Sequence, residues 1–107
     1  MAKQNLFLCF LVFLSFTRFC QGNTGRPKVW CVADDTASDD ILMDFFDRVP
    51  TKYLENIAPG KPCFLPFTTR SLASYVLNLV YRKTGKCPPH LGEKTPIDPS
   101  YGNCKYP

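Results

Sequence analysis

The cysteines constrain the fold of this chain more than any other feature. The sequence has six cysteines in 107 residues, and two of them, Cys9 and Cys20, fall in an apolar N-terminal stretch. An even number of cysteines in a short secreted chain indicates a framework of disulfides. A metal site is the alternative, but the chain has no Cys-x-x-Cys pair and a single histidine, His90. We therefore expect two disulfides and no metal or other cofactor; the four cysteines are Cys31, Cys63, Cys87 and Cys104.

The N-terminal stretch predicts secretion. Lys3 precedes an apolar run over residues 6–16, and Gly22 provides a small residue where a signal peptidase would cleave. The alternative is an uncleaved membrane anchor, but the run is shorter than the roughly 20 apolar residues that a spanning helix needs. We expect residues 1–22 to be a signal peptide, residues 23–28 a flexible leader and residues 29–107 a single domain without a membrane span.

The charge of the chain does not indicate a charged partner. Removal of Lys3 and Arg18 with the signal peptide lowers the formal net charge from +4 to +2. This charge is too small to favour nucleic acid or an anionic membrane as a partner. The remaining 85 residues bury only a small core, so the disulfides should contribute much of the stability. We expect a secreted, soluble monomer.

An acidic block over residues 34–47 predicts the first helix. Ser38 can cap this helix, and Asp39 and Asp40 then lie in its first turn, where the helix dipole favours negative charge. Pro50 marks its end. The block contains six aspartates, but they lack the spacing of a calcium-binding loop. The expected buried face consists of Ile41, Leu42, Phe45, Phe46 and Val49.

A second helix is predicted within residues 62–86, and the rest of the domain should pack around it. Apolar residues recur there at helical spacing; Thr68 or Thr69 can cap the start, and Gly85 can end it. A row beside the apolar stripe would offer rings and hydrogen-bonding groups to a sugar. Composition alone favours the alternative, a solvated helix face. The row comprises Arg70, Ser74, Tyr75, Asn78, Tyr81 and Arg82.

The remaining segments are expected to be strands and loops. Residues 29–32 are apolar and suit a strand, and residues 51–62 read as a connection with a turn at Pro59-Gly60. In that connection Tyr53, Leu54 and Ile57 should pack on the core. Residues 87–99 should form a loop or a short strand, and His90 should lie at the surface. The tail, residues 98–107, should form a turn and a short strand that Cys104 holds in place.

Four separated motifs match one known family. They are VWCVA at 29–33, PGKPCF at 59–64, ASY at 73–75 with Asn78 and Tyr81, and DPSYGNCKYP at 98–107. Together they resemble the plant carbohydrate-binding module of family 43. The resemblance covers residues 29–107 and implies an α+β fold with two helices packed on a small antiparallel sheet. It also implies the disulfides Cys31–Cys87 and Cys63–Cys104.

The resemblance further implies a function without catalysis. Modules of this family bind β-1,3-glucan (callose) in the plant cell wall, so we expect a secreted protein of the cell wall or apoplast, including plasmodesmata. A glycosidase of the common type would need two positioned carboxylates, and Glu55 and Glu93 are the only glutamates. The residues expected to contact glucan are Phe64, Arg70, Tyr75, Asn78 and Tyr81.

The chain departs from the family pattern at several positions. The family normally has six cysteines in the domain, and the missing middle pair would fall at Pro50 and Leu54. The family usually has an acidic residue and an amide after the Pro-Cys motif, where this chain has apolar residues, and one of a pair of tyrosines is absent. These changes weaken the expected glucan binding and leave an alternative, a degenerate module that serves as a structural or protein-interaction domain. The substitutions that motivate it are Leu65, Phe67, Leu77 and Val80.

Overall fold

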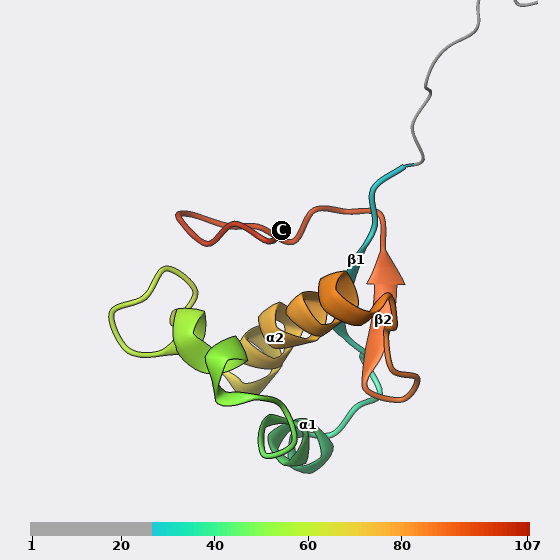
Figure 1. The fold of residues 1–107 in the computed structure, drawn as a ribbon, viewed down its shortest axis with the longest axis horizontal. Helices are drawn as coiled ribbons and strands as arrows, with labels where there is room; N and C mark the ends of the chain where they lie inside the picture. The colour runs from blue at the N-terminus through green and yellow to red at the C-terminus, as the bar shows by residue number, and fades with distance from the viewer. Residues whose placement is uncertain (1–26) are drawn as a thin grey trace, which may run out of the picture.

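The computed structural model describes residues 27–107, which fold around one central helix (Figure 1). The predicted signal peptide and most of the leader lie outside the described residues. In chain order the elements are strand β1 (Trp30–Ala33), helix α1 (Asp39–Phe46), 3-10 helix η1 (Thr51–Ile57), helix α2 (Thr69–Thr84) and strand β2 (Gly92–Thr95).

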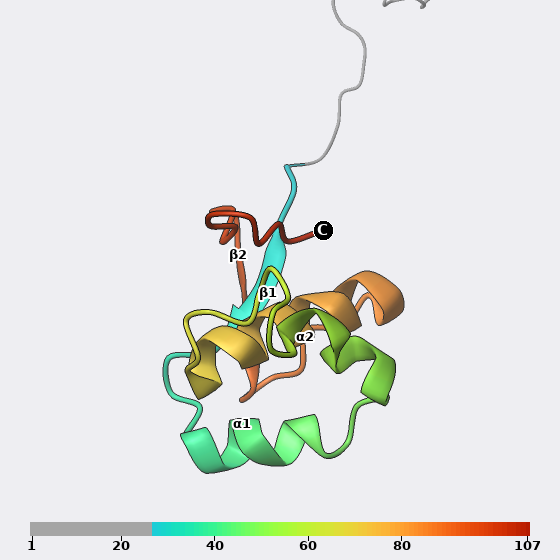
Figure 2. The same ribbon diagram turned by 90° about the vertical axis from the view of Figure 1, so that its left-hand side faces the viewer.

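Helix α2 lies between the sheet and the other two helices (Figures 1 and 2). Strands β1 and β2 pair antiparallel, with Trp30 opposite Thr95 and Ala33 opposite Gly92. This arrangement confirms the α+β prediction and the strand near residues 29–32. The connection over 51–62 has the predicted turn at Pro59-Gly60, and Tyr53, Leu54 and Ile57 pack on the core as predicted. The sequence did not predict η1, which occupies the first part of this connection and contacts α2.

Both α-helices begin where the sequence predicts. The Ser38 hydroxyl accepts a hydrogen bond from the backbone N–H of Ile41 at 3.3 Å, and the Thr68 hydroxyl accepts one from Ser71 at 3.2 Å. Each bond satisfies a donor that the first turn leaves unpaired. Gly85 ends α2 in the left-handed conformation with φ 76°, which glycine adopts without a steric cost.

The core has two parts, one on each side of α2. Leu42 and Phe45 of α1 pack against Val76 and Leu77 of α2 in the first part. Ile41 does not belong to it: the prediction that it is buried is wrong, and 46% of this residue is exposed. Because Leu42 and Phe45 face α2, the side chain of the preceding residue Ile41 lies on the flank of α1, where solvent reaches it. The second part lies under the tail and consists of Trp30, Cys63, Tyr75, Cys104 and Tyr106.

The two disulfides hold the ends of the domain to its centre, and both predicted pairings are confirmed. Cys31–Cys87 ties β1 to the segment that follows α2, while Cys63–Cys104 ties the loop before α2 to the tail. A Cβ atom at Gly92 would lie 2.7 Å from Cys31 Sγ, so β2 can pass the first disulfide only with a glycine there.

The tail differs from its prediction. It forms the predicted turn, in which Tyr101 and Cys104 exchange backbone hydrogen bonds at 3.0 and 2.8 Å, but not the predicted short strand. Gly102 has φ 52°, a turn conformation that interrupts extended pairing.

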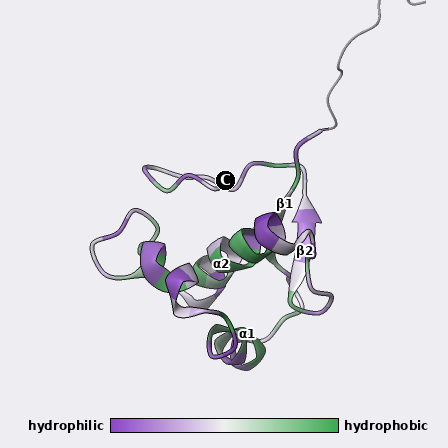
Figure 3. Ribbon diagram, viewed as in Figure 1, coloured by the Kyte–Doolittle hydropathy of each residue, from purple (hydrophilic) through white to green (hydrophobic). Residues whose placement is uncertain are grey.

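Hydrophilic residues lie on β2 and at the C-terminal end of α2 (Figure 3). Over residues 27–107 we find no helix with the length and apolar character required to cross a membrane.

Candidate functional site

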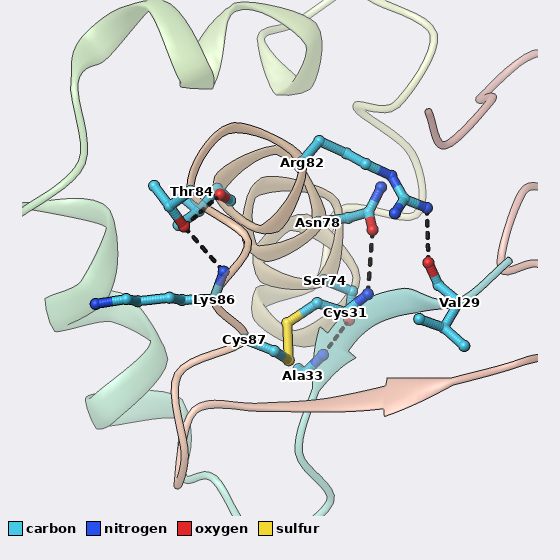
Figure 4. The surroundings of a disulfide bond; sticks show 10 residues. Val29, Cys31, Ala33, Ser74, Asn78, Arg82, Thr84, Lys86 and Cys87 are labelled. Carbon is cyan, nitrogen blue, oxygen red and sulfur yellow. Dashed lines mark hydrogen bonds between the residues drawn. A yellow bond between two sulfur atoms is a disulfide. The ribbon is translucent and has the colours of Figure 1, made fainter. Parts of the chain in front are cut away.

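Asn78 is buried, although the sequence places it in an exposed row on α2. It has no exposed surface. Its side-chain oxygen accepts a hydrogen bond from the backbone N–H of Cys31 at 3.1 Å (Figure 4), and its side-chain nitrogen donates to the carbonyl oxygen of Pro107 at 3.2 Å. The expectation that this amide is exposed is therefore wrong, because β1 and the tail cover this side of the helix.

Tyr75 is buried as well, with 4% of the residue exposed. Its hydroxyl accepts a hydrogen bond from the side-chain nitrogen of Asn56 at 2.9 Å. Its ring packs edge-on against the ring of Tyr106, at 5.2 Å between centroids. The expected exposed ring is not formed, because the tail packs over it and places Tyr75 in the second part of the core.

The two arginines of the row bind backbone carbonyls. Arg70 is half-buried and donates to the carbonyl oxygens of Asp34 and Ala37 at 2.6 and 2.7 Å, so it holds the connection between β1 and α1. Arg82 donates to the carbonyl oxygen of Val29 at 2.7 Å (Figure 4) and to that of Pro107 at 2.9 Å. Both guanidinium groups position neighbouring segments.

Phe64 and Tyr81 lie half-buried, near opposite ends of α2. The Tyr81 ring has two cations near it, the Arg82 guanidinium at 5.2 Å and the Lys94 ammonium of β2 at 5.8 Å. Phe64 lies in the loop before α2 and stacks on Phe67 at 5.0 Å between ring centroids. The five residues expected to contact glucan thus do not form one surface, because Tyr75 and Asn78 are buried; contact with a ligand remains a prediction for Phe64, Arg70 and Tyr81, which are half-buried.

A groove lies between the loop before α2 and the tail, and we call it the tail groove. The disulfide Cys63–Cys104 joins its two walls, which are close together at the end of the domain in Figure 1. The groove has a volume of about 530 Å³. It offers two aromatic rings together with an ammonium and an amide. Its lining residues are Gly60, Lys61, Pro62, Phe64, Leu65, Tyr101, Gly102 and Asn103.

The sequence interpretation missed Lys61, Tyr101 and Asn103 as candidate site residues. A signal for them was present, because the two walls come from the motifs PGKPCF and SYGNC, and each motif contains one cysteine of the expected pair Cys63–Cys104. Motifs joined by a disulfide must lie within a few ångströms of each other.

A second groove lies between α1, η1 and the segment from Phe64 to Thr69, and we call it the apolar groove. Its volume is about 620 Å³. Leu54, at one position of the missing family cysteines, lies in its wall and packs on the core. Phe64 borders both grooves. The lining residues are Met43, Phe46, Leu54, Ile57, Pro59, Phe64, Phe67, Thr68, Thr69 and Leu72.

Among residues 27–107, three side chains have clearly shifted pKa values, and none of them lines either groove. Hydrogen bonds from Thr36 lower the pKa of Asp34, and hydrogen bonds from Ser100 lower the pKa of Asp98. Burial raises the pKa of Tyr106. Within the part of the chain that the structure describes, no three His, Cys, Asp or Glu side chains are grouped so that they could hold a metal ion.

The tail groove is built from the motifs that carry the family resemblance, and comparison with known proteins decides the family. The chain is 34% identical over 94 residues to the major pollen allergen Ole e 10 of Olea europaea, and the match covers 80% of this chain and 73% of the allergen. The chain belongs to carbohydrate-binding module family 43. The match covers most of both proteins.

Two other relatives of the module carry glucan or callose in their names. The first is plasmodesmata callose-binding protein 5 of Arabidopsis thaliana, 30% identical over 80% of this chain and 52% of that protein. The second is glucan endo-1,3-beta-D-glucosidase of Olea europaea, 34% identical over 78% of this chain and 20% of that enzyme. The chain therefore spans only about a fifth of this glucosidase relative. No protein-family model and no solved structure matches the chain.

Proposed function

We propose that this protein is a secreted, non-catalytic module that binds β-1,3-glucan in the plant cell wall through the tail groove. The observation that carries the proposal is the composition of this groove. The rings of Phe64 and Tyr101 can stack on the apolar faces of sugar rings, and Lys61 and Asn103 can bond to hydroxyl groups. The names of the glucan-related relatives support β-1,3-glucan as the ligand.

The same groove supports binding without hydrolysis. Hydrolysis of a glycosidic bond by the common mechanism uses two carboxyl groups on either side of the bond. Neither Asp nor Glu is among the residues that line the tail groove. A glucan held there would meet rings, an ammonium and an amide, but not the pair of carboxyl groups that this mechanism requires.

The test is retention on insoluble β-1,3-glucan, with cellulose as the polysaccharide control. We expect the wild-type protein to be retained on β-1,3-glucan and not on cellulose. The double variant Lys61→Ala/Asn103→Ala should weaken binding about tenfold or more, because each lost hydrogen bond contributes on the order of 1 kcal/mol. Both side chains are exposed, so the fold should persist. The control is Lys52→Ala, which removes an exposed lysine of η1 that does not line the tail groove.

Two results would contradict the proposal in different ways. Absence of wild-type retention would refute glucan binding itself. Loss of retention in Tyr81→Ala, with Lys61→Ala/Asn103→Ala unaffected, would place the contact at the C-terminal end of α2 and refute the tail groove. Thermal melts of each variant establish that a loss of binding is not a loss of folding.

A specific observation supports the second candidate function, a structural or protein-interaction domain. Two of the apolar substitutions away from the family pattern are strongly exposed, Leu65 at 65% and Phe67 at 70%. Large apolar side chains exposed around a groove are typical of interaction sites. Leu77, in contrast, is completely buried and belongs to the core.

A further inference from the structure

The apolar groove exposes side chains that a folded domain usually covers. Met43 on its α1 side is 53% exposed, and Phe67 on the opposite side is 70% exposed. The Thr69 hydroxyl lies 3.8 Å from the Met43 sulfur, so α1 and the start of α2 meet at one end of the groove. The rings of Phe64 and Phe67, which both line the groove, stack on each other with an interplanar angle of 28°. This surface is suited to burying apolar side chains of another molecule.

The polar groups of the groove do not suit a sugar. Thr68 and Thr69 provide the only side-chain oxygens among the residues that line it, and no amide or charged group accompanies them. A buried sugar hydroxyl without a hydrogen-bond partner is costly. A peptide helix avoids this cost, because its backbone groups are paired internally and its apolar side chains at i, i+3, i+4 and i+7 enter the groove.

The edge of the groove on α1 is acidic. Asp39 precedes Met43 by four residues in α1 and lies on the same face of the helix, and Asp47, four residues after Met43, is the C-cap residue that continues the helical backbone by one residue. Both carboxylates are exposed, and neither has a salt-bridge partner within residues 27–107; the ion pair recorded there joins Asp44 to Arg48 at 3.2 Å. An occupant with positive charges beside its apolar side chains would complement this edge.

We propose that the apolar groove is the docking site for a cationic amphipathic helix of a partner protein. Its apolar side chains fill the groove between Met43 and Phe67, and its Lys or Arg side chains pair with Asp39 and Asp47. This site is separate from the proposed glucan contact, although Phe64 borders both. The variants that test docking therefore leave Phe64 unchanged.

The probe is a synthetic helical peptide with leucines at i, i+3, i+4 and i+7 and lysines beside them. A twin peptide has the same leucines and glutamates in place of the lysines. Each is titrated into the isotope-labelled secreted protein, and binding is followed by NMR. We expect shift changes along α1 and residues 64–69. The lysine peptide should bind at least about tenfold tighter than its twin, by a difference that falls with added salt.

Two pairs of variants separate the apolar and the charged parts of the interaction. Met43→Ser/Phe67→Ser should weaken binding of the lysine peptide about tenfold or more. Its matched control is Ile97→Ser, since Ile97 is 75% exposed and does not line the groove. Asp39→Asn/Asp47→Asn should remove most of the preference for the lysine peptide over its twin. The control Asp35→Asn should keep that preference.

Four results would overturn the docking proposal. Equal affinity for the two peptides would refute the charge complementarity, and shift changes away from the groove would refute the location. Displacement of the peptide by a soluble β-1,3-glucan oligosaccharide would identify the groove as a sugar site. Self-association of the protein that Met43→Ser abolishes would identify a second copy of this chain as the occupant. Retention on insoluble glucan is measured in parallel, so failure of docking and failure of glucan binding remain distinguishable.

Discussion

Substitution of Asn78 by alanine distinguishes a structural amide from a ligand-binding one. In the native structure the Asn78 oxygen is the partner of the Cys31 backbone N–H, and both residues are completely buried. The variant leaves this N–H unpaired away from water, which costs about 1–3 kcal/mol. The Pro107 carbonyl oxygen still has the bond from Arg82, so its loss adds little. With the small cavity included, we expect a decrease of about 3 kcal/mol in the free energy of unfolding.

The assay is urea and thermal unfolding with both disulfides intact. For a domain of this size, about 3 kcal/mol corresponds to a fall in Tm of about 12–24 °C. The control Asn56→Ala removes one part-buried hydrogen bond, to the hydroxyl of Tyr75, and should cost less than Asn78→Ala, about 1 kcal/mol, because the amide itself is exposed. Below its unfolding temperature Asn78→Ala should still be retained on β-1,3-glucan. A variant with wild-type stability that no longer binds glucan would refute the reasoning and make Asn78 a ligand contact.

Two further predictions concern the tail. Replacing Cys63 and Cys104 by alanine opens a loop closed over 41 residues, and in the chain-entropy model this should lower the free energy of unfolding by about 4 kcal/mol, as measured by urea unfolding. The same variant should lose retention on glucan. Unchanged retention would show that the tail groove forms without this disulfide. Burial raises the pKa of Tyr106 above that of an unfolded tyrosine, so the unfolded chain releases this proton first and stability should fall as the pH rises above about 10. Tyr106→Phe should remove that part of the alkaline decrease, and an unchanged pH profile would contradict it.

The loss of the middle cysteine pair has a structural counterpart. Leu54 stands at one of these positions and packs against the core from η1, while Pro50 at the other position precedes this 3-10 helix. Apolar packing thus occupies a place where the family normally has a short-range disulfide. A bridge over so few residues restricts the unfolded chain little, which is why its absence is compatible with a folded domain.

Local signals in the sequence determined the framework of this protein. The caps at Ser38 and Thr68, the end of α2 at Gly85 and the position of β1 follow from hydrogen bonding and backbone preference within a few residues. The pairing of the four cysteines followed from the resemblance to the family. The caps, the end of α2 and the position of β1 depend little on what packs against them, and the sequence therefore predicts them correctly.

Only the tertiary structure decided which side chains of α2 are available to a ligand. Tyr75 and Asn78 lie beside the apolar stripe, where an isolated amphipathic helix would expose them. In the folded domain β1 and the tail cover that side, so Asn78 becomes a buried partner of the backbone and Tyr75 part of the core. The tail reaches this position because Cys104 joins Cys63 and because Arg82 binds the Pro107 carbonyl. Burial of a helix face depends on contacts between residues distant in the chain, and helical periodicity does not contain that information.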